Sequence, residues 1–174
     1  AGLIYMTCGA AASLTVSLKA ICSAGDEVLL LAPYFPEYQV FVRNAGAVPV
    51  VVPGRVGAFD IDFDALSAAI SGKTRAVIVN SPNNPSGVVY SEETVRAMCN
   101  VLRRKSAEFG HLIYLIADEP YRELVYDGYE TPFIPNIYEN TVVCYSWSKS
   151  LSLPGERIGY VFVPDRCADS VDLF

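Results

Sequence analysis

Residues 141–163 read TVVCYSWSKSLSLPGERIGYVFV, two strand-like runs joined by a polar turn. The runs at 141–145 and 157–163 are rich in β-branched and aromatic residues, as strands are. Too little chain separates them for the crossover that two parallel neighbours require. The second run is therefore predicted to lie antiparallel in its sheet, either at an edge or as an inserted strand.

Five further apolar runs precede this pair, at 3–7, 27–31, 47–52, 75–80 and 112–117. They lack a clean alternation of apolar and polar residues, which is typical of strands buried on both faces. Helix-like segments lie between most of them, at 10–23, 36–44, 62–70 and 92–109. This alternation predicts an α/β fold with three α/β/α layers and a seven-stranded, mostly parallel sheet in which one strand is antiparallel.

The composition narrows the classes of function. Hydrophobic residues make up 52% of the 174 residues and charged residues 18%, against roughly 25% charged in an average soluble domain. The net charge of -6, with no basic run longer than RRK at 103–105, argues against nucleic-acid and anionic-membrane partners. The apolar runs are too short to span a bilayer and no signal peptide opens the chain, so we expect a cytoplasmic protein.

Cysteine and histidine usage argues against a metal centre. Five cysteines without a C-x-x-C pair indicate free thiols in a reducing compartment, and there is a single histidine. Three other patterns are also set aside. SGKTR (71–75) precedes a strand and lacks the first glycine of a phosphate-binding loop. DIDFD (60–64) lacks the glycine and the glutamate of a calcium loop. The G-x-S-x-G motif of serine hydrolases is not present.

Polar and aromatic residues gather in the loops that follow the predicted strands, where ligands of open α/β sheets bind. These loops read TCGAAA, APYFPEY, NSPNNPSG, DEPY and SWSKS. In the first loop, Gly9 permits a tight turn, while Ala10 and Ala11 leave the first amides of the following helix open to an anion such as phosphate. An ordinary strand-to-helix turn accounts for this loop equally well.

The later loops offer groups for a flat, polar ligand. Asp118 emerges from an apolar run, where a carboxylate is costly to desolvate unless it meets a cation or a protonated heterocycle; the alternative is a turn or helix cap. Asn83 or Asn84 would present an amide to a ligand hydroxyl or phenolate, and Tyr121 would aim a phenol at the same place. Lys149 is either a solvated loop lysine or a reactive amine.

One ligand would use all five loops. It would have an anion for the first loop, a flat ring beside Phe35, a ring oxygen for the amide and the phenol, a ring nitrogen for the carboxylate and an aldehyde for the amine. This is the outline of pyridoxal 5'-phosphate.

The ordered segments NNPSG, DEPY and SWSKSLSLPGERIGY resemble the fold-type I, class I/II aminotransferase family, which carries N-P-x-G, D-x-x-Y and S-x-S-K with an arginine eight residues later. The resemblance covers about residues 3 to 164. It implies that Lys149 forms a Schiff base with pyridoxal phosphate and moves protons at the substrate's α-carbon. It also implies that Asp118 pairs with the pyridine nitrogen.

The same resemblance assigns the remaining cofactor contacts. Asn84 and Tyr121 would bind the ring's phenolic oxygen, and Phe35 would stack on the ring, with Tyr34 as a neighbouring candidate. The phosphate would be held by residues of two loops: Arg157, Ser146 and the amides of Ala10 and Ala11. Gly9 and Ser148, in the same loops, complete the predicted cofactor site.

The implied function is amino-group transfer between an α-amino acid and a 2-oxo acid. A lyase of the β C-S type or a synthase of the same fold is an alternative, and a non-catalytic binding module is a third, against which the intact Lys149, Asp118 and Arg157 weigh. Members of this family are about twice as long, so residues 1–174 are expected to be the cofactor-binding large domain without the N-terminal segment and small C-terminal domain, inactive alone. The resemblance further implies a homodimer of the full-length protein and cis peptide bonds at Ala32–Pro33 and Asn84–Pro85.

Overall fold

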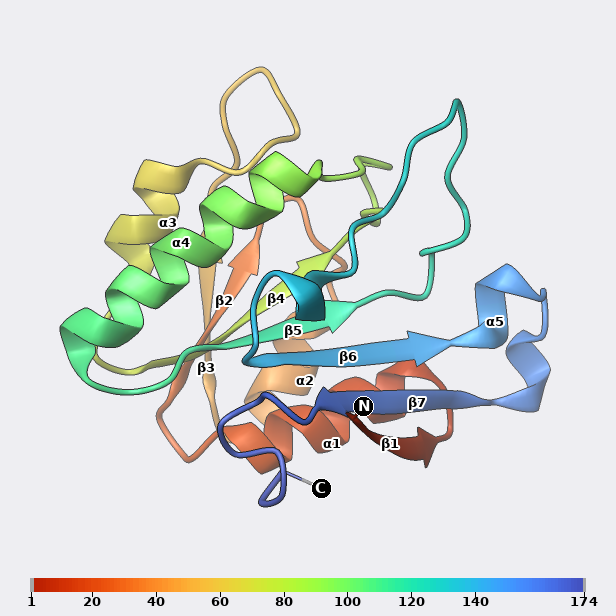
Figure 1. The fold of residues 1–174 in the computed structure, drawn as a ribbon, viewed down its shortest axis with the longest axis horizontal. Helices are drawn as coiled ribbons and strands as arrows, with labels where there is room; N and C mark the ends of the chain where they lie inside the picture. The colour runs from red at the N-terminus through yellow and green to blue at the C-terminus, as the bar shows by residue number, and fades with distance from the viewer. Residues whose placement is uncertain (1, 174) are drawn as a thin grey trace.

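The computed structural model describes residues 2–173, and a seven-stranded sheet forms its centre (Figure 1). The strands are β1 (Gly2–Thr7), β2 (Glu27–Leu31), β3 (Val48–Val52), β4 (Thr74–Asn80), β5 (Tyr114–Asp118), β6 (Thr141–Ser146) and β7 (Gly159–Pro164). Their order is β1-β7-β6-β5-β4-β2-β3, and only β7 pairs antiparallel with its neighbours. The predicted fold class is confirmed, and β7 is an inserted strand between β1 and β6.

Helices cover both faces of this sheet (Figure 1). They are α1 (Ala10–Ile21), α2 (Tyr38–Asn44), α3 (Phe63–Ala69), α4 (Glu92–Phe109) and the short α5 (Trp147–Ser150), with 3-10 turns η1 (Ile134–Asn136) and η2 (Pro154–Glu156). One buried cluster joins α1 and α2 to the sheet, and another joins α3 and α4 to its opposite face. The result is the expected three-layer arrangement.

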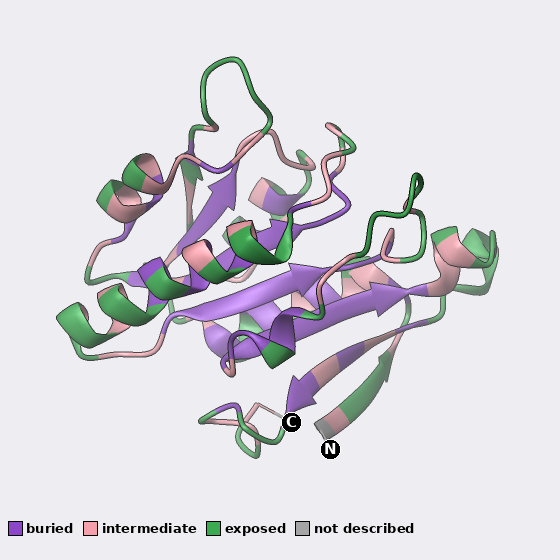
Figure 2. Cartoon of the chain, turned by 45° about the horizontal axis from the view of Figure 1, so that its top comes forward, coloured by how far each residue is buried: buried purple, intermediate pink, exposed green. Residues whose placement is uncertain are grey.

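The central strands are apolar throughout because each face packs against a helical layer. In β2, Val28 and Leu30 belong to the cluster under α1 and α2, whereas Leu29 and Leu31 belong to the one under α3 and α4. All five residues of β5 are buried, in agreement with the continuous purple strands of Figure 2. Full burial of one such aliphatic side chain contributes about 1.5 to 3 kcal/mol. Two-sided burial explains why the sequence shows runs instead of alternation.

Several element boundaries differ from those predicted. The helix predicted at 36–44 begins only at Tyr38, and the strand predicted to start at residue 157 begins at Gly159, because Arg157 adopts a left-handed conformation with φ 51° that no strand accommodates. The predicted turn after β6 contains α5 and η2. The two predicted cis peptide bonds are confirmed, and Ser81–Pro82 is a third.

Gly159 lies where the end of β6, the start of β7 and the loop after β1 come together. A Cβ built on Gly159 would fall 2.8 Å from Cα of Gly9 and still closer to the carbonyl oxygen of Tyr145. These are backbone atoms, which cannot rotate away. We expect Gly159→Ala to lower the free energy of unfolding by about 1 to 3 kcal/mol, the usual range for overpacking, as measured by urea denaturation.

Gly155→Ala provides the matched control for this prediction. Within residues 2–173, a Cβ built at Gly155 meets nothing within 4 Å beyond its immediate chain neighbourhood, so this variant should unfold at nearly the wild-type urea concentration. Equal stability of the two alanine variants would contradict the close backbone approach at Gly159.

Candidate active site

A cavity of about 320 Å³ opens at the carboxyl ends of the parallel strands. Apart from Gly9 and the alternative candidates Tyr34 and Asn83, every residue that the sequence predicted for the site lines it: Ala10, Ala11, Phe35, Asn84, Asp118, Tyr121, Ser146, Ser148, Lys149 and Arg157. These residues follow five different strands and span most of the chain. The fold therefore brings all five predicted loops to one place.

One corner of the cavity is built to receive an anion. The first hydrogen bonds of α1 run from the amides of Ala12 and Ser13 to the carbonyl of Gly9, each 3.1 Å long, and no side chain caps the helix. The amides of Ala10 and Ala11 precede these bonds and lie beside the cavity. A helix start with open amides attracts negative charge.

Arg157 brings a full positive charge to the same corner. Its Nη2 donates to the carbonyl of Cys8 at 3.2 Å, which holds the guanidinium against the loop after β1. Gly9 has φ 90°, and a Cβ there would lie 2.7 Å from this Nη2. Glycine at this position thus meets two demands, the backbone conformation and the room for Arg157. Gly9 shapes this corner even though it does not line the cavity.

Asp118 lines the same cavity at the end of β5 and is only 5% exposed. Its Oδ2 accepts a hydrogen bond of 2.5 Å from the hydroxyl of Tyr38. Its Oδ1 is buried and has no hydrogen-bond partner among the described residues. Burial raises the pKa of Asp118 to about 6, opposed by the bond from Tyr38. A buried carboxylate oxygen without a partner calls for a cationic donor.

Asn84 and Tyr121, which were predicted to bind the same ligand oxygen, are hydrogen-bonded to each other. Asn84 Nδ2 donates to the hydroxyl of Tyr121 at 3.3 Å. The backbone amide of Asn84 donates to Oδ1 of Asn80 at 2.6 Å, and Nδ2 of Asn80 donates to the carbonyl of Asp118 at 2.8 Å. Asn80 thereby ties the loop after β4 to the end of β5. The alternative candidate Asn83 instead bonds the carbonyl of Pro33 and does not line the cavity.

Lys149 projects from the one-turn helix α5 and is exposed. Its Nζ lies 6.0 Å from the centroid of the Tyr121 ring. Ser146, which precedes α5, is buried, and it lines the cavity together with Ser148 and Lys149. The lysine and the phenol thus lie close together, and neither side chain is fully buried.

Two polar residues of the cavity, Tyr38 and Asn80, were not predicted. Tyr38 is the last residue of the APYFPEY segment, and Asn80 is a buried amide at the end of an apolar strand. A polar residue at the end of a buried strand was the available signal for Asn80. Nothing in the sequence indicated that Tyr38 reaches Asp118, 80 residues away along the chain.

The segment that carries Tyr121 is anchored by an ion pair between the half-buried Arg122 and the buried Glu119. Arg122 Nη1 lies 2.9 Å from Oε2 of Glu119, whose side chain is 3% exposed, and Nη2 donates to the carbonyl of Thr131 at 3.0 Å. Burial raises the pKa of Glu119 to about 7, while Arg122 opposes the rise. These bonds fasten residues 119–131 to one another and so limit where Tyr121 can move.

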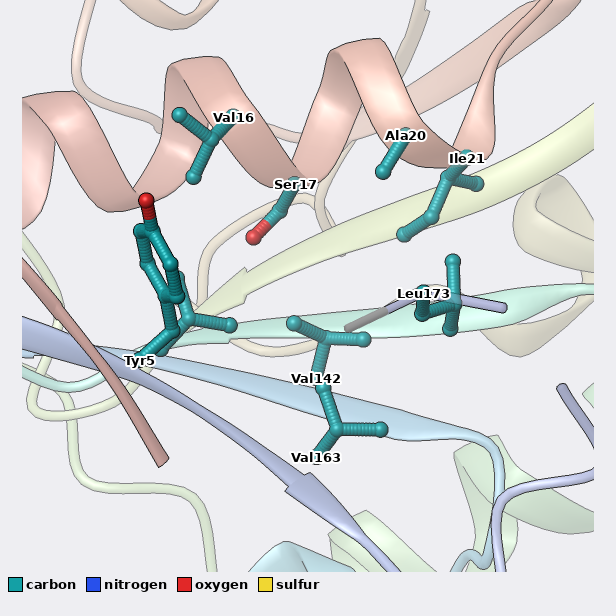
Figure 3. Close-up of a pocket in the computed structure, with 9 residues that line it drawn as sticks. Tyr5, Val16, Ser17, Ala20, Ile21, Val142, Val163 and Leu173 are labelled. Carbon is teal, nitrogen blue, oxygen red and sulfur yellow. The ribbon is translucent and has the colours of Figure 1, made fainter. Parts of the chain in front are cut away.

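A second cavity, of about 230 Å³, lies between α1 and the β1–β7 side of the sheet (Figure 3). Its lining is mainly apolar and includes Val16, Ile21, Val163 and Leu173, with the Tyr5 phenol at one end. None of the predicted site residues borders it. This apolar cavity is therefore separate from the predicted site. Within residues 2–173, no helix has both the length and the apolar character needed to cross a bilayer.

Comparison with known proteins gives consistent matches. The family model for aminotransferase class I and II matches residues 1–174. A probable aspartate/prephenate aminotransferase from Thermus aquaticus is 40% identical over 162 residues, which is 91% of this chain and 40% of that protein. An aspartate aminotransferase from Geobacillus stearothermophilus is 35% identical over 166 residues, or 92% of this chain and 41% of that protein.

Solved structures agree with the fold. The crystal structure of an aminotransferase from Eubacterium rectale has a TM-score of 0.96 and 60% identity, covering 98% of this chain and 43% of that one. An aspartate aminotransferase from Thermus thermophilus, solved with maleate, has a TM-score of 0.83 and 33% identity, covering 97% of this chain and 43% of that one. The chain thus spans about two fifths of the length of these relatives.

Proposed function

The chain belongs to the class I and II aminotransferase family, and from this we propose that residues 1–174 form the pyridoxal 5'-phosphate-binding large domain of a longer enzyme. That enzyme would transfer an amino group between an α-amino acid and a 2-oxo acid. The observation that carries the proposal is the buried, unpartnered Oδ1 of Asp118 in a cavity that Lys149 also lines. A protonated pyridine nitrogen is a donor of the required charge and shape.

The remaining lining residues suit the rest of this cofactor. Arg157, Ser146 and the open amides at the start of α1 would hold the phosphate group. Asn84 and Tyr121 would bind the phenolic oxygen, Phe35 would lie against the ring, and Lys149 would hold the cofactor covalently through Nζ. Gly9 keeps room for the guanidinium, and Ser148 lines the same cavity as Lys149.

Each residue type has a role in the proposed reaction. When bound, pyridoxal phosphate supplies a ring that withdraws electrons from the substrate's α-carbon. The negative charge of Asp118 would hold a proton on the ring nitrogen, which strengthens this withdrawal. The substrate amine would displace Lys149 Nζ from the cofactor. The freed Nζ would then accept the proton of the α-carbon and return it to the bound cofactor. Arg157 and the helix amides would keep the phosphate in place during this exchange.

The proposal for the whole protein includes a cytoplasmic homodimer with small amino acid and 2-oxo acid substrates and no nucleic-acid or membrane partner. The support for dimerisation is the apolar surface of β1, where Ile4, Tyr5 and Met6 are each more than half exposed. Sedimentation of the full-length protein at micromolar concentration should give the mass of a dimer, and a monomer would contradict this part of the proposal. The isolated chain is expected to bind cofactor weakly and to have no transaminase activity.

The reaction is tested on the full-length protein loaded with pyridoxal phosphate. Incubation with a panel of amino acids and 2-oxo acids should give exchange of amino groups, with each new amino acid formed at the expense of another. The alternative of a β C-S lyase predicts release of ammonia and pyruvate instead. Cofactor binding without either outcome would favour a non-catalytic module.

A further inference from the structure

We propose that Tyr38 is a positioning residue that fixes the carboxylate of Asp118 and the ring of Phe35 in the orientation that the cofactor ring requires. The inference rests on the proposed role of Asp118 as the partner of the ring nitrogen. Tyr38 lies outside the predicted set of cofactor contacts.

Tyr38 is itself held rigidly. It is the first residue of α2 and only 2% exposed, within the cluster that α1 and α2 form with the sheet. Its amide donates to the carbonyl of Phe35 at 3.0 Å, which closes a turn between the two residues. A side chain packed on all sides cannot follow Asp118 if the carboxylate rotates, so it acts as a fixed point.

The bond from Tyr38 leaves one carboxylate oxygen for a ligand. The hydroxyl donates to Oδ2 of Asp118 at 2.5 Å, whereas Oδ1 has no partner in residues 2–173. The backbone of Asp118 is held separately, because Asn80 Nδ2 donates to its carbonyl at 2.8 Å. With the main chain and one oxygen fixed, the direction in which Oδ1 points is fixed as well.

The same bond favours the charged form of Asp118. A phenol that donates to a carboxylate stabilises the anion and so opposes the desolvation that comes with burial. Burial raises the pKa of Tyr38 well above its usual value, so the phenol keeps its proton to donate. The other titratable groups that act on this pair are Cys144, Tyr121 and Glu119, and their negative forms would disfavour further negative charge.

Tyr38 also contacts the residue proposed to lie against the cofactor ring. The rings of Phe35 and Tyr38 meet edge to face, with centroids 5.6 Å apart and planes at 80°. Such pairs have a preferred geometry. One side chain therefore contacts both the group proposed for the ring nitrogen and the group proposed for the ring face.

The test compares Tyr38→Phe with Tyr138→Phe in the full-length protein. Tyr138 is an equally buried tyrosine whose hydroxyl donates to the carbonyl of Ile113 at 2.6 Å, remote from the cavity. Both variants lose one buried hydrogen bond and keep the ring. In the cofactor-free protein with ¹³C-labelled aspartate, Tyr38→Phe should raise the pKa of the Asp118 carboxyl by about one unit, whereas Tyr138→Phe should leave it unchanged.

Cofactor affinity gives a second readout. Tyr38→Phe should weaken binding of pyridoxal phosphate by roughly 5- to 10-fold, the equivalent of one hydrogen bond. In an Asp118→Asn background the same change should have almost no effect on cofactor affinity, because Tyr38 acts through the carboxylate. The effects of two residues coupled in this way are not additive. Additive losses together with an unchanged Asp118 titration would overturn the proposal. If the wild-type protein failed to bind pyridoxal phosphate, the proposed function would fail, while the carboxyl titration would still decide the role of Tyr38.

Discussion

Replacement of Lys149 with alanine is expected to lower turnover of the full-length protein by roughly 10⁴-fold or more, the upper range for loss of a catalytic base. No other lysine lines the cavity, so no neighbouring amine can accept the proton of the substrate's α-carbon. Cofactor should still bind, without a covalent bond, because Arg157, Ser146 and the amides of α1 are unchanged. The measurements are steady-state turnover and the loss of the visible absorption band of the covalently held cofactor.

Borohydride reduction locates the covalent bond directly. Peptide mapping of the reduced wild-type protein should find the cofactor on Lys149, and the alanine variant should carry none. Lys73→Ala, at an exposed position distant from the cavity, is the control and should keep both the adduct and the activity. A cofactor adduct on Lys19, Lys73 or Lys105 would instead show that Lys149 is an ordinary solvated lysine.

Replacement of Asp118 with asparagine should reduce turnover by about 10² to 10³-fold, as for the loss of one preorganised electrostatic contact. The amide is nearly the same size but has no negative charge, so it would not hold a proton on the ring nitrogen of the proposed cofactor. Lys149 remains, so the covalent bond to the cofactor should still form. An Asp118→Asn enzyme with wild-type turnover would refute the assignment of this carboxylate.

The same substitution should change how stability depends on pH in the cofactor-free protein. The pKa of Asp118 is raised from 3.8 to about 6 in the folded state, so its contribution is fully present below about pH 4 and is lost as the pH rises through 6. The free energy of unfolding of wild type relative to Asp118→Asn should fall by about 3 kcal/mol between pH 4 and pH 8. Urea denaturation at each pH measures the difference, with the exposed Asp64→Asn as a control.

The fold was predictable because its signals are local and agree with one another. Apolar runs marked each strand to within about two residues at either end, and α4 has the predicted bounds because Ser91 accepts a bond from the Thr94 amide at its start and Gly110 ends it with φ 72°. The boundary errors occur where the backbone conformation of a single residue sets the start of an element, as at Arg157 before β7. The short α5 and η2 gave no periodic signal, since each is only about one turn long.

The predicted site residues came together because parallel strands end at one edge of the sheet. What the sequence did not indicate are contacts between residues far apart in the chain. Tyr38 reads as an ordinary helix residue, and only the packing of α2 against the sheet places its hydroxyl on Asp118. Asn80 is similar, because its two bonds join segments that no local pattern relates.

The reversed direction of β7 sets the distance between two of the proposed site residues. Because β7 runs against β6, its starting end lies at the edge where β6 finishes, and the chain that carries Lys149 needs only a short return to deliver Arg157. The seven residues from Ser150 to Glu156 therefore set the distance between the amine of Lys149 and the guanidinium of Arg157. An insertion there would shift one group relative to the other while leaving every strand in register, whereas most loops of an α/β protein can lengthen without altering its chemistry.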